Sequence, residues 1–374
     1  MALESHPVLS KGGAPAGEPA TKAKTATSKS SSAARPAGKA TPAASKSTKR
    51  KRSRYGIPTF ADSAAGDIAE FDDPAVRRAA VEAIGRYNGS VVVVDPNTGR
   101  ILSIVNQPLA FSAGYQPCST IKPYIGVAAL EEGIITRDSM IKVGRRRYLN
   151  LTEALAHSDN PFFEELGGRM GFERVSQHAR LLGLGELAGY NIFEEHPGLF
   201  PNSPPEFGGV RRMSSFGEGI HMTPLQLASL GVTVANGGTM YYLQYPRNEE
   251  ERRNFEPRIK RKLEIEAYLP DVREGMLAAV LYGTGRRAFD PDGDAALGKT
   301  GTCSDQGSRL GWFVSYADQQ HPKLVVVVLI RGQNHVVGGG TAALIAGRVY
   351  TKLREQNYFQ ASTNNAATVA TAGH

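Results

Sequence analysis

Apolar positions in this chain follow no regular spacing at first, and periodic patterns begin only near residue 74. Between residues 74 and 85, Val76, Ala79, Ala80 and Ile84 recur at the spacing of one helix face, and a glycine closes the segment. This pattern predicts a short amphipathic helix. It also places the start of the folded body well inside the chain.

Two runs of β-branched residues, GSVVVV and ILSIV, follow this helix and flank the turn sequence DPNTG, which predicts a β-hairpin. Strand-like runs return in the last third, in the segments DAALGKTGT, GWFVSYAD and KLVVVVLIRG. A helical pattern over residues 338–356 closes the body. Strand patterns therefore occur near both ends of the body.

The middle of the body, residues 150–240, is dominated by helical patterns that end at glycine or proline. We expect a loop at residues 203–209, and an exposed hairpin or loop at residues 246–262, where opposite charges nearly balance. Together these patterns predict an α/β (α+β) fold: a central antiparallel sheet built from both chain ends, flanked by helices, with an inserted helical subdomain.

Charge divides the chain into unequal parts. The full sequence of 374 residues has 44 Lys and Arg against 36 Asp and Glu, a net charge of +8. Residues 1–54 hold twelve of these bases and two of the acids, so the rest of the chain, with 32 bases and 34 acids, has a net charge of −2. A nucleic-acid-binding surface needs basic residues of the folded domain itself, so no nucleic acid partner is expected.

Composition predicts three regions. Residues 1–54 have no aromatic side chain and are rich in Ala, Ser, Thr, Pro, Gly and Lys, which predicts a disordered basic tail. Residues 55–357 form the predicted folded domain, and residues 358–374 a disordered C-terminal tail. The basic tail fits a solvated linker, and it also fits contact with a membrane surface or with partners in a cell-wall complex.

The sequence shows no clear sign of export or membrane insertion. The longest apolar run of the body, LVVVVLI at residues 324–330, is far shorter than the roughly 20 residues of a membrane-spanning helix. No signal peptide is visible at the N-terminus. The chain has two cysteines, Cys118 and Cys303, which is too few for a disulfide scaffold or a Cys-rich zinc site.

Candidate chemistry begins with Ser119 and Lys122, which are three residues apart where a helix is predicted to start. This spacing places the hydroxyl and the amine on one helix face. A lysine that loses its solvent has a lowered pKa and can accept the serine proton. The helix N-terminus adds backbone N–H groups where an oxyanion would form. Ser119 is therefore a candidate nucleophile.

Two further motifs support the hypothesis that Ser119 is a nucleophile. The sequence Ser-Asp-Asn occurs at residues 158–160, and Lys-Thr-Gly-Thr occurs at residues 299–302 on a predicted strand. A Ser and a Lys three apart are common by chance, whereas the three motifs in this order are typical of β-lactamases and penicillin-binding proteins.

The sequence resembles the transpeptidase domains of class B penicillin-binding proteins over residues 74–353, well beyond the three motifs. Further similar segments are QPCSTIKPYIGVAALEEG, GIHMTPLQLASLGVTVANGG and VREGMLAAVLYGTGRRA. The resemblance implies a serine D,D-transpeptidase that crosslinks peptidoglycan stem peptides through an acyl-enzyme and is inhibited by β-lactams. It implies no metal or organic cofactor, and a location in the cell envelope or periplasm.

The resemblance also implies roles for individual residues. Ser119 is the expected nucleophile and Lys122 its base. Ser158 is expected to relay a proton, Asn160 to hold the substrate amide, and Lys299 to keep the site positive and orient Ser158.

The Lys-Thr-Gly-Thr strand is expected to bind substrate. Thr300 and Thr302 share one strand face and are expected to bind the terminal carboxylate, while the N–H groups of Ser119 and Thr302 form the oxyanion hole. Gly301 is expected to let this strand approach the nucleophile helix. A disulfide between Cys118 and Cys303 is implied by similarly placed cysteines in class A carbapenem-hydrolysing β-lactamases; two free buried thiols are the alternative.

Two alternative enzymes use the same acylation machinery: a D,D-carboxypeptidase or a β-lactamase would pass the acyl group to water. A further alternative of another class is a non-catalytic β-lactam or peptidoglycan sensor, or a scaffold of a division complex. Glu194 and Glu195 are the acids that could suggest a deacylating base of the β-lactamase kind, but they lack that family's surrounding pattern and are interpreted as loop acids.

Overall fold

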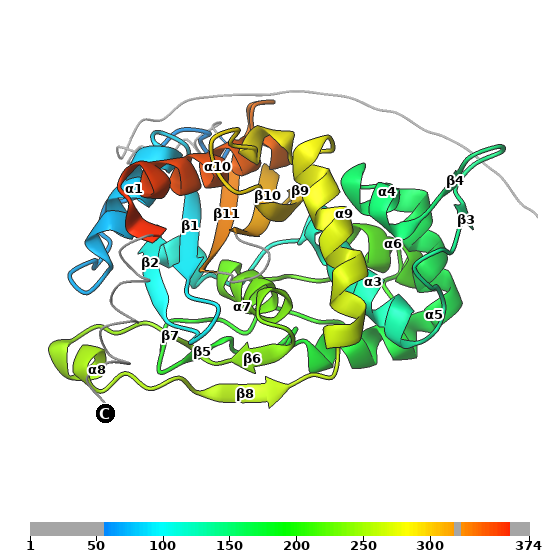
Figure 1. Ribbon diagram of the computed structural model, residues 1–374, viewed down its shortest axis with the longest axis horizontal. Coiled ribbons are helices and arrows are strands. Elements are labelled where there is room, and N and C mark those ends of the chain that lie inside the picture. The colour runs from blue at the N-terminus through cyan, green and yellow to red at the C-terminus, as the bar shows by residue number, and fades with distance from the viewer. Residues whose placement is uncertain (1–55, 318–322, 360–374) are drawn as a thin grey trace, which may run out of the picture. The chain divides into compact units, whose positions relative to one another are not determined.

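The computed structural model describes residues 56–317 and 323–359 (Figure 1). The predicted basic tail, residues 1–54, lies outside the described residues. Of the predicted C-terminal tail only Tyr358 and Phe359 are described, and the Tyr358 hydroxyl donates a hydrogen bond to Asp73 (3.0 Å).

A five-stranded antiparallel sheet forms the centre of the body, with the strand order β2-β1-β11-β10-β9. Its strands are β1 (Gly89–Val94), β2 (Ile101–Val105), β9 (Leu297–Asp305), β10 (Ser308–Ala317) and β11 (Leu324–Gly332). The N-terminal hairpin and the three C-terminal strands therefore meet in one sheet, as the sequence predicts. Among the described residues, β9 lies at an edge of this sheet and has a strand partner on one side only.

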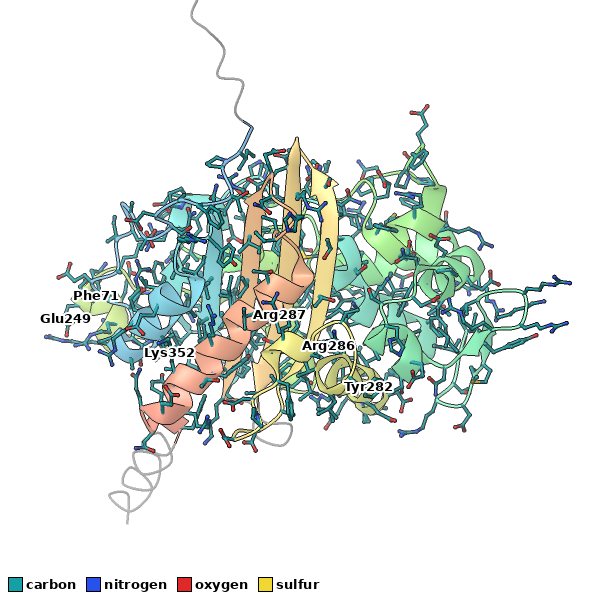
Figure 2. The ribbon with its side chains drawn as sticks, turned by 90° about the horizontal axis from the view of Figure 1, so that it is seen from above. Phe71, Glu249, Tyr282, Arg286, Arg287 and Lys352 are labelled. Carbon is teal, nitrogen blue, oxygen red and sulfur yellow. A yellow bond between two sulfur atoms is a disulfide. The ribbon has the colours of Figure 1, made fainter. Side chains whose placement is uncertain are left out.

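Both faces of the sheet are buried at β1, β2 and β11, which explains why these three strands are largely apolar. Side chains alternate between two cores: Val92 and Val94 of β1 join one, and Val91 and Val93 join the other. Helices α1 (Pro74–Ile84) and α10 (Gly339–Glu355) cover one face, and α7 (Pro224–Ala235) packs on the opposite face. Figure 2 shows α10 lying across the strands.

The segment between β2 and β9 is mostly helical, as predicted, and contains three short two-stranded ribbons (Figure 1). Its helices are α2 (Gln107–Ala110), α3 (Lys122–Glu131), α4 (Leu151–Ala156), α5 (Asn160–Leu181), α6 (Gly209–Phe216), α7, α8 (Glu249–Arg253) and α9 (Leu269–Leu281). Single turns of 3-10 helix are η1 (Cys118–Ile121), η2 (Glu266–Tyr268) and η3 (Arg286–Ala288). The ribbon strands are β3 (Ile141–Lys142), β4 (Tyr148–Leu149), β5 (Gly189–Tyr190), β6 (Thr239–Tyr241), β7 (Leu243–Gln244) and β8 (Ile259–Lys262).

Local sequence signals set several helix ends. The Asp73 side chain accepts two backbone N–H groups at the start of α1, and Thr223 and Gln226 form a reciprocal capping box at the start of α7. Gly171 (φ 77°) interrupts α5 with a non-helical backbone conformation. Across residues 56–317 and 323–359, no helix has both the length and the apolar composition needed to cross a membrane.

The prediction for residues 246–262 is wrong in part. This segment contains α8 and the strand β8, which pairs with β6 rather than closing a hairpin on itself. α8 has no buried residue, and it is held by its Asn248 cap and by ion pairs between Glu249 and Arg252 or Arg253. Such a helix has no apolar face, so hydrophobic periodicity cannot reveal it. Helix α6 and the β3–β4 ribbon are likewise absent from the elements that the sequence pattern predicts.

Candidate active site

Three separate parts of the fold bring the predicted catalytic residues together. Ser119 lies on η1 and Lys122 begins α3 directly after it. Ser158 lies in the turn between α4 and α5, and Lys299 lies on the edge strand β9. Contacts between η1 and β9, and between α3 and α5, hold these parts against one another.

The turn around Ser119 is tightly built. Cys118 has a positive φ of 52°, which is uncommon for a residue other than glycine. The Thr120 hydroxyl donates to the carbonyl of Pro117 (2.6 Å) and ties the turn to itself. Ser119 is only 8% exposed, and its hydroxyl forms no hydrogen bond with another group in the described part of the chain. Apo enzymes often have such loose catalytic contacts, which tighten when substrate binds.

Lys122 is fully buried and its Nζ has three acceptors. These are the carbonyl oxygen of Ser158 (2.6 Å), the hydroxyl of Ser158 (3.1 Å) and the amide oxygen of Asn160 (2.6 Å). An ammonium has three N–H donors, so its hydrogen bonds are all satisfied in the charged form. The amine of the first motif is thus held by the second motif.

Lys299 is fully buried as well and approaches the same hydroxyl from the other side. Its Nζ donates to Ser158 Oγ (2.8 Å) and to the carbonyl oxygen of Thr300 (3.0 Å). Ser158 therefore bridges the two lysines through its hydroxyl oxygen, and its own proton remains available to a further acceptor. Ser158 has a positive φ of 56°, which turns its side chain toward both amines at a backbone cost.

Burial also determines the electrostatics of the two amines. Desolvation lowers the pKa of Lys122 to about 7, although the carboxylates of Asp159 and Glu164 partly oppose this shift. Desolvation, with a smaller contribution from the charge of Lys122, lowers the pKa of Lys299 well below its usual range. A lysine with a pKa near 7 is a proton acceptor at neutral pH.

Asp159 holds the turn that carries Ser158. Its carboxylate accepts the N–H of Phe162 (3.0 Å) at the start of α5, and it forms an ion pair with Arg147, which precedes β4. An Asp at a helix N-cap is favoured because it satisfies a free N–H group and lies near the positive end of the helix dipole. The middle residue of the Ser-Asp-Asn motif is therefore a structural anchor.

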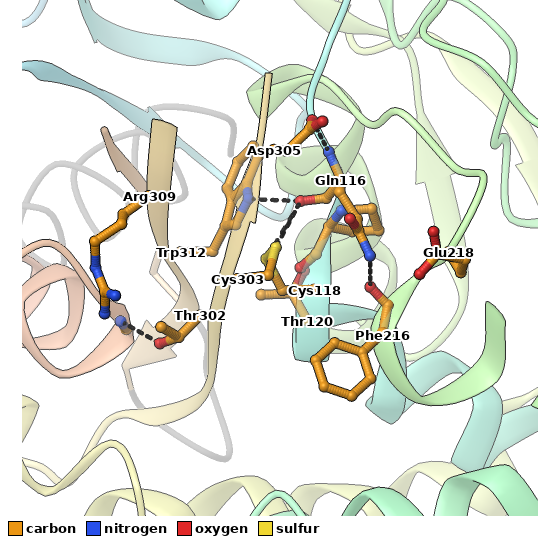
Figure 3. Close-up of a disulfide and its surroundings, with 12 residues drawn as sticks. Gln116, Cys118, Thr120, Phe216, Glu218, Thr302, Cys303, Asp305, Arg309 and Trp312 are labelled. Atoms are coloured by element: carbon orange, nitrogen blue, oxygen red, sulfur yellow. Dashed lines mark hydrogen bonds between the residues drawn. A yellow bond between two sulfur atoms is a disulfide. The ribbon is translucent and has the colours of Figure 1, made fainter. Parts of the chain in front are cut away.

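The Lys-Thr-Gly-Thr strand lies directly against the turn of the candidate nucleophile. A Cβ atom on Gly301 would lie 3.0 Å from the carbonyl oxygen of Pro117 and 3.1 Å from Cγ2 of Thr120, so a side chain there would force the two parts away from each other. Cys118 and Cys303 are joined by a disulfide across this contact (Figure 3). This is the pairing that the resemblance implies.

The residue before Pro117 adds a third tie, which the sequence analysis did not identify. The indole N–H of Trp312 donates to the carbonyl oxygen of Gln116 (3.0 Å), and the Gln116 N–H donates to Asp305 (3.0 Å) (Figure 3). Trp312 is fully buried in the core, and its indole also fixes the segment that leads into η1.

The free edge of β9 points a backbone carbonyl toward the amine of Lys299. Because the Thr300 carbonyl accepts from Lys299, the N–H and C=O groups of Thr300 face this edge rather than β10. Backbone groups of alternate residues point to the same side of a strand, so the Thr302 N–H faces this edge too. This direction is the one that an oxyanion-hole donor needs.

The side chains of Thr300 and Thr302 both lie on the sheet face covered by α10. The Thr300 hydroxyl is hydrogen-bonded to the hydroxyl of Thr284 (2.6 Å), and the Thr302 hydroxyl accepts the N–H of Gly339 (2.8 Å). Thr300 is buried and Thr302 is exposed. Thr284 was not identified from the sequence; its only signal was a threonine between two glycines.

The loop acids Glu194 and Glu195 lie apart from these contacts. Glu194 pairs with Arg247, and the carboxylate of Glu195 accepts the N–H groups of Ala188 and Gly189. Burial raises the pKa of Glu195. The described residues contain no group of three or more His, Cys, Asp and Glu side chains arranged to hold a metal ion.

Comparison with known proteins gives a family and a fold. The family model described as penicillin binding protein transpeptidase domain matches residues 89–351. The chain is 29% identical over 281 residues to stage V sporulation protein D of Bacillus subtilis, covering 66% of this chain and 43% of that protein. It is 27% identical over 350 residues to the peptidoglycan D,D-transpeptidase MrdA of Acinetobacter baumannii, covering 72% of this chain and 51% of that protein. The chain thus spans about half the length of these relatives.

Solved structures share the fold at lower sequence identity. The transpeptidase domain of penicillin-binding protein 3 from Burkholderia pseudomallei has a TM-score of 0.64 at 22% identity, over 75% of this chain and 92% of that chain. Penicillin-binding protein 2 of Pseudomonas aeruginosa has a TM-score of 0.65 at 21% identity, over 74% of this chain and 76% of that chain. The predicted sheet with its inserted helical region is thereby confirmed.

Proposed function

This chain belongs to the family of penicillin-binding protein transpeptidase domains, and on that basis we propose that it is a serine D,D-transpeptidase. Its substrates are peptidoglycan stem peptides that end in D-Ala-D-Ala, and β-lactams are its inhibitors. Two similar proteins, MrdA of A. baumannii and FtsI of Escherichia coli, are named peptidoglycan D,D-transpeptidases, which supports this activity.

Acylation uses the groups around Ser119. The neutral amine of Lys122 accepts the Ser119 proton, directly or through the Ser158 hydroxyl, while Ser119 Oγ attacks the carbonyl carbon between the two D-Ala residues. The resulting oxyanion is stabilised by the N–H groups of Ser119 and Thr302. The C–N bond then breaks, and the proton returns from Lys122 through Ser158 to the leaving amine of D-Ala.

Transfer completes the reaction. An amine of a neighbouring stem peptide attacks the ester carbonyl of Ser119 and its proton passes to Lys122. The C–O bond to Ser119 then breaks, and Lys122 returns the proton to the Ser119 oxygen, which restores the hydroxyl. Asn160 orients the substrate amide, and Thr300 and Thr302 hold the terminal carboxylate of the donor. In a carboxypeptidase or a β-lactamase, water would take the place of the amine. Glu194 and Glu195 do not support that outcome, because the described contacts pair them with Arg247 and with the backbone of Ala188 and Gly189.

One observation carries this proposal: the Ser158 hydroxyl lies between two fully buried lysine amines, at 3.1 Å from Lys122 and 2.8 Å from Lys299. Burying two amines reduces the stability of the fold, and their lowered pKa values favour proton transfer at neutral pH. Such a pair is typical of a catalytic site rather than of a binding scaffold.

The direct test is labelling with a fluorescent penicillin. The purified protein is expected to form a covalent adduct that survives denaturation and is retained for many minutes, whereas Ser119→Ala forms none. Ser112→Ala, in the loop after α2, is a matched control that should label like the unchanged protein. Absence of labelling in well-folded protein would contradict the proposal, and rapid release of the label with turnover would indicate a β-lactamase instead.

We place this reaction in the cell envelope, where peptidoglycan is crosslinked. The basic residues of segment 1–54 are proposed to contact an anionic membrane surface or a partner in a cell-wall complex.

A further inference from the structure

The turn after α9 connects two of the motifs. It consists of Gly283, Thr284 and Gly285, and the Thr284 N–H donates to the carbonyl oxygen of Ala156 (3.0 Å), two residues before Ser158. A Cβ on Gly283 would lie 2.1 Å from the same oxygen, so only glycine lets the turn lie this close to the end of α4. Figure 2 shows Tyr282 and Arg286, which flank this turn, at the end of α9.

The side chain of Thr284 reaches the third motif. Its hydroxyl oxygen lies 2.6 Å from the hydroxyl oxygen of Thr300, next to Lys299 on β9. Thr284 is exposed while Thr300 is buried, so this hydroxyl pair joins a solvent-accessible residue to a buried one beside Lys299. Thr284 therefore contacts the Ser-Asp-Asn turn through its backbone and the Lys-Thr-Gly-Thr strand through its hydroxyl.

The pair of hydroxyls has two protons, and only one of them can lie between the two oxygens. If Thr300 donates its proton to an anion, its oxygen must accept the proton of Thr284. Hydrogen bonds in such a chain strengthen one another, and a hydroxyl that accepts a hydrogen bond is a better donor. Without Thr284, the Thr300 hydroxyl could rotate and would lose this polarisation.

We propose that Thr284 is a positioning residue for the substrate carboxylate: its hydroxyl orients the Thr300 hydroxyl as a donor to the terminal carboxylate of the acyl donor. This inference rests on the proposed function, in which Thr300 binds that carboxylate. Thr284 thereby contributes to selection of donors that end in a free carboxylate, although it belongs to none of the three motifs.

A matched pair of substrates tests this role. One is an acyl-D-alanyl thioester whose leaving group ends in a free carboxylate, and the other carries a primary amide in place of that carboxylate. The readout is the ratio of kcat/KM for the acid to kcat/KM for the amide, measured by thiol release. Thr284→Val keeps the β-branched shape and removes the hydroxyl, and it should lower this ratio about tenfold. Thr284→Ser keeps the hydroxyl and should retain the ratio within about twofold.

A double substitution tests whether Thr284 acts through Thr300. Thr300→Val should lower the ratio at least as much as Thr284→Val, and adding Thr284→Val to Thr300→Val should change it little further, because the effects of coupled residues are not additive. Thermal unfolding verifies that each variant is folded. If Thr284→Val does not fold, Thr284→Ala, which removes the side chain at an exposed position, takes its place.

The outcomes separate the two proposals. An unchanged ratio in Thr284→Val, an equal loss for acid and amide, or a ratio in Thr284→Ser as low as in Thr284→Val would each overturn the role of Thr284 while leaving the transpeptidase proposal intact. If the unchanged protein reacts with neither thioester and takes no penicillin label, the proposed function itself fails, and the inference that rests on it fails too.

Discussion

At the scale of single residues, the candidate site contains two amines that are buried away from the water that would stabilise their charge. Lys122 is fully buried, and burial lowers its pKa to about 7. The unfolded chain consequently binds more protons at this lysine than the folded chain between pH 7 and its ordinary pKa of 10.5. Lys122 therefore opposes folding at neutral pH, and this cost falls as the pH rises through that window.

The same pKa predicts how acylation depends on pH. If neutral Lys122 is the base, the second-order rate constant of acylation by a β-lactam should rise about tenfold from pH 6 to pH 8 and level off above, because the neutral fraction of a group with a pKa near 7 rises by that factor. Stopped-flow measurements with a chromogenic β-lactam would give this profile. A flat profile over the range would contradict the role of Lys122.

A matched variant separates Lys122 from other titrating groups. Asp159→Asn keeps a side chain that can cap α5 but removes the negative charge that raises the pKa of Lys122. The rising part of the profile should therefore move to lower pH. An unmoved profile would assign the titration to another group.

At the scale of elements, the proposed function depends on how closely β9 approaches η1. A Cβ at Gly301 would be crowded, since such an atom would lie 3.0 Å from the carbonyl oxygen of Pro117 and 3.2 Å from Cβ of Trp312. Both neighbours are held in place, because Trp312 is fully buried and the Thr120 hydroxyl binds the Pro117 carbonyl. Relief of a clash must then come from separation of the strand and the turn.

Gly301→Ala is accordingly expected to reduce the acylation rate at least tenfold and to destabilise the fold by about 1–3 kcal/mol, the usual cost of overpacking. Penicillin labelling and chemical denaturation measure the two effects. Gly144→Ala is the control: its Cβ would make one ordinary contact with Arg147, at 3.7 Å, and both properties should stay unchanged. Normal acylation by Gly301→Ala would show that this close approach is not needed.

Most elements could be predicted from the sequence because they bury continuous or periodic apolar runs. The hairpin of β1 and β2, the helix that follows Ser119, and the strand β11 are buried along almost their whole length, and their apolar runs reveal them. α8 buries no side chain and is held by Asn248 and by charge pairs. Its physical basis is local and polar, so the apolar pattern contains no trace of it.

At the scale of the whole molecule, a covalent bond joins the helical region to the sheet. The Cys118–Cys303 disulfide closes a loop of 185 residues between the turn of the candidate nucleophile and β9. A cross-link over so long a loop restricts the unfolded chain strongly, and loss of a native disulfide typically costs about 2–5 kcal/mol. The bond also limits how far η1 and β9 can separate.

Reduction of this bond should lower both the melting temperature and the acylation rate. Thiol counting on denatured protein should find no free thiol before treatment with dithiothreitol and two afterwards. The Cys118→Ser, Cys303→Ser double variant should show the lower melting temperature from the start and no response to the reductant. Two free thiols in untreated protein, or a melting temperature that dithiothreitol does not change, would contradict the prediction.

The net charge of the whole chain comes from its N-terminal segment rather than from the candidate site. The net charge of +8 combines +10 from residues 1–54 with −2 from the rest, whereas the two amines of the candidate site, Lys122 and Lys299, are buried and have lowered pKa values. The overall basic character therefore says nothing about the substrate.

Sequence patterns alone were enough to identify the family, the sheet with its helical insertion, and the three motifs, because periodicity and motif spacing are local properties of the chain. The tertiary structure alone decides how the motifs meet. Lys122 and Ser158 are 36 residues apart, and Ser158 and Lys299 are 141 apart, yet both lysine amines contact the Ser158 hydroxyl. Their burial lowers the pKa values of both lysines, and the hydroxyl contact of Thr284 with Thr300 appears only when α9 packs beside β9. Desolvation and long-range contact arise from packing, which no local pattern of residues can specify.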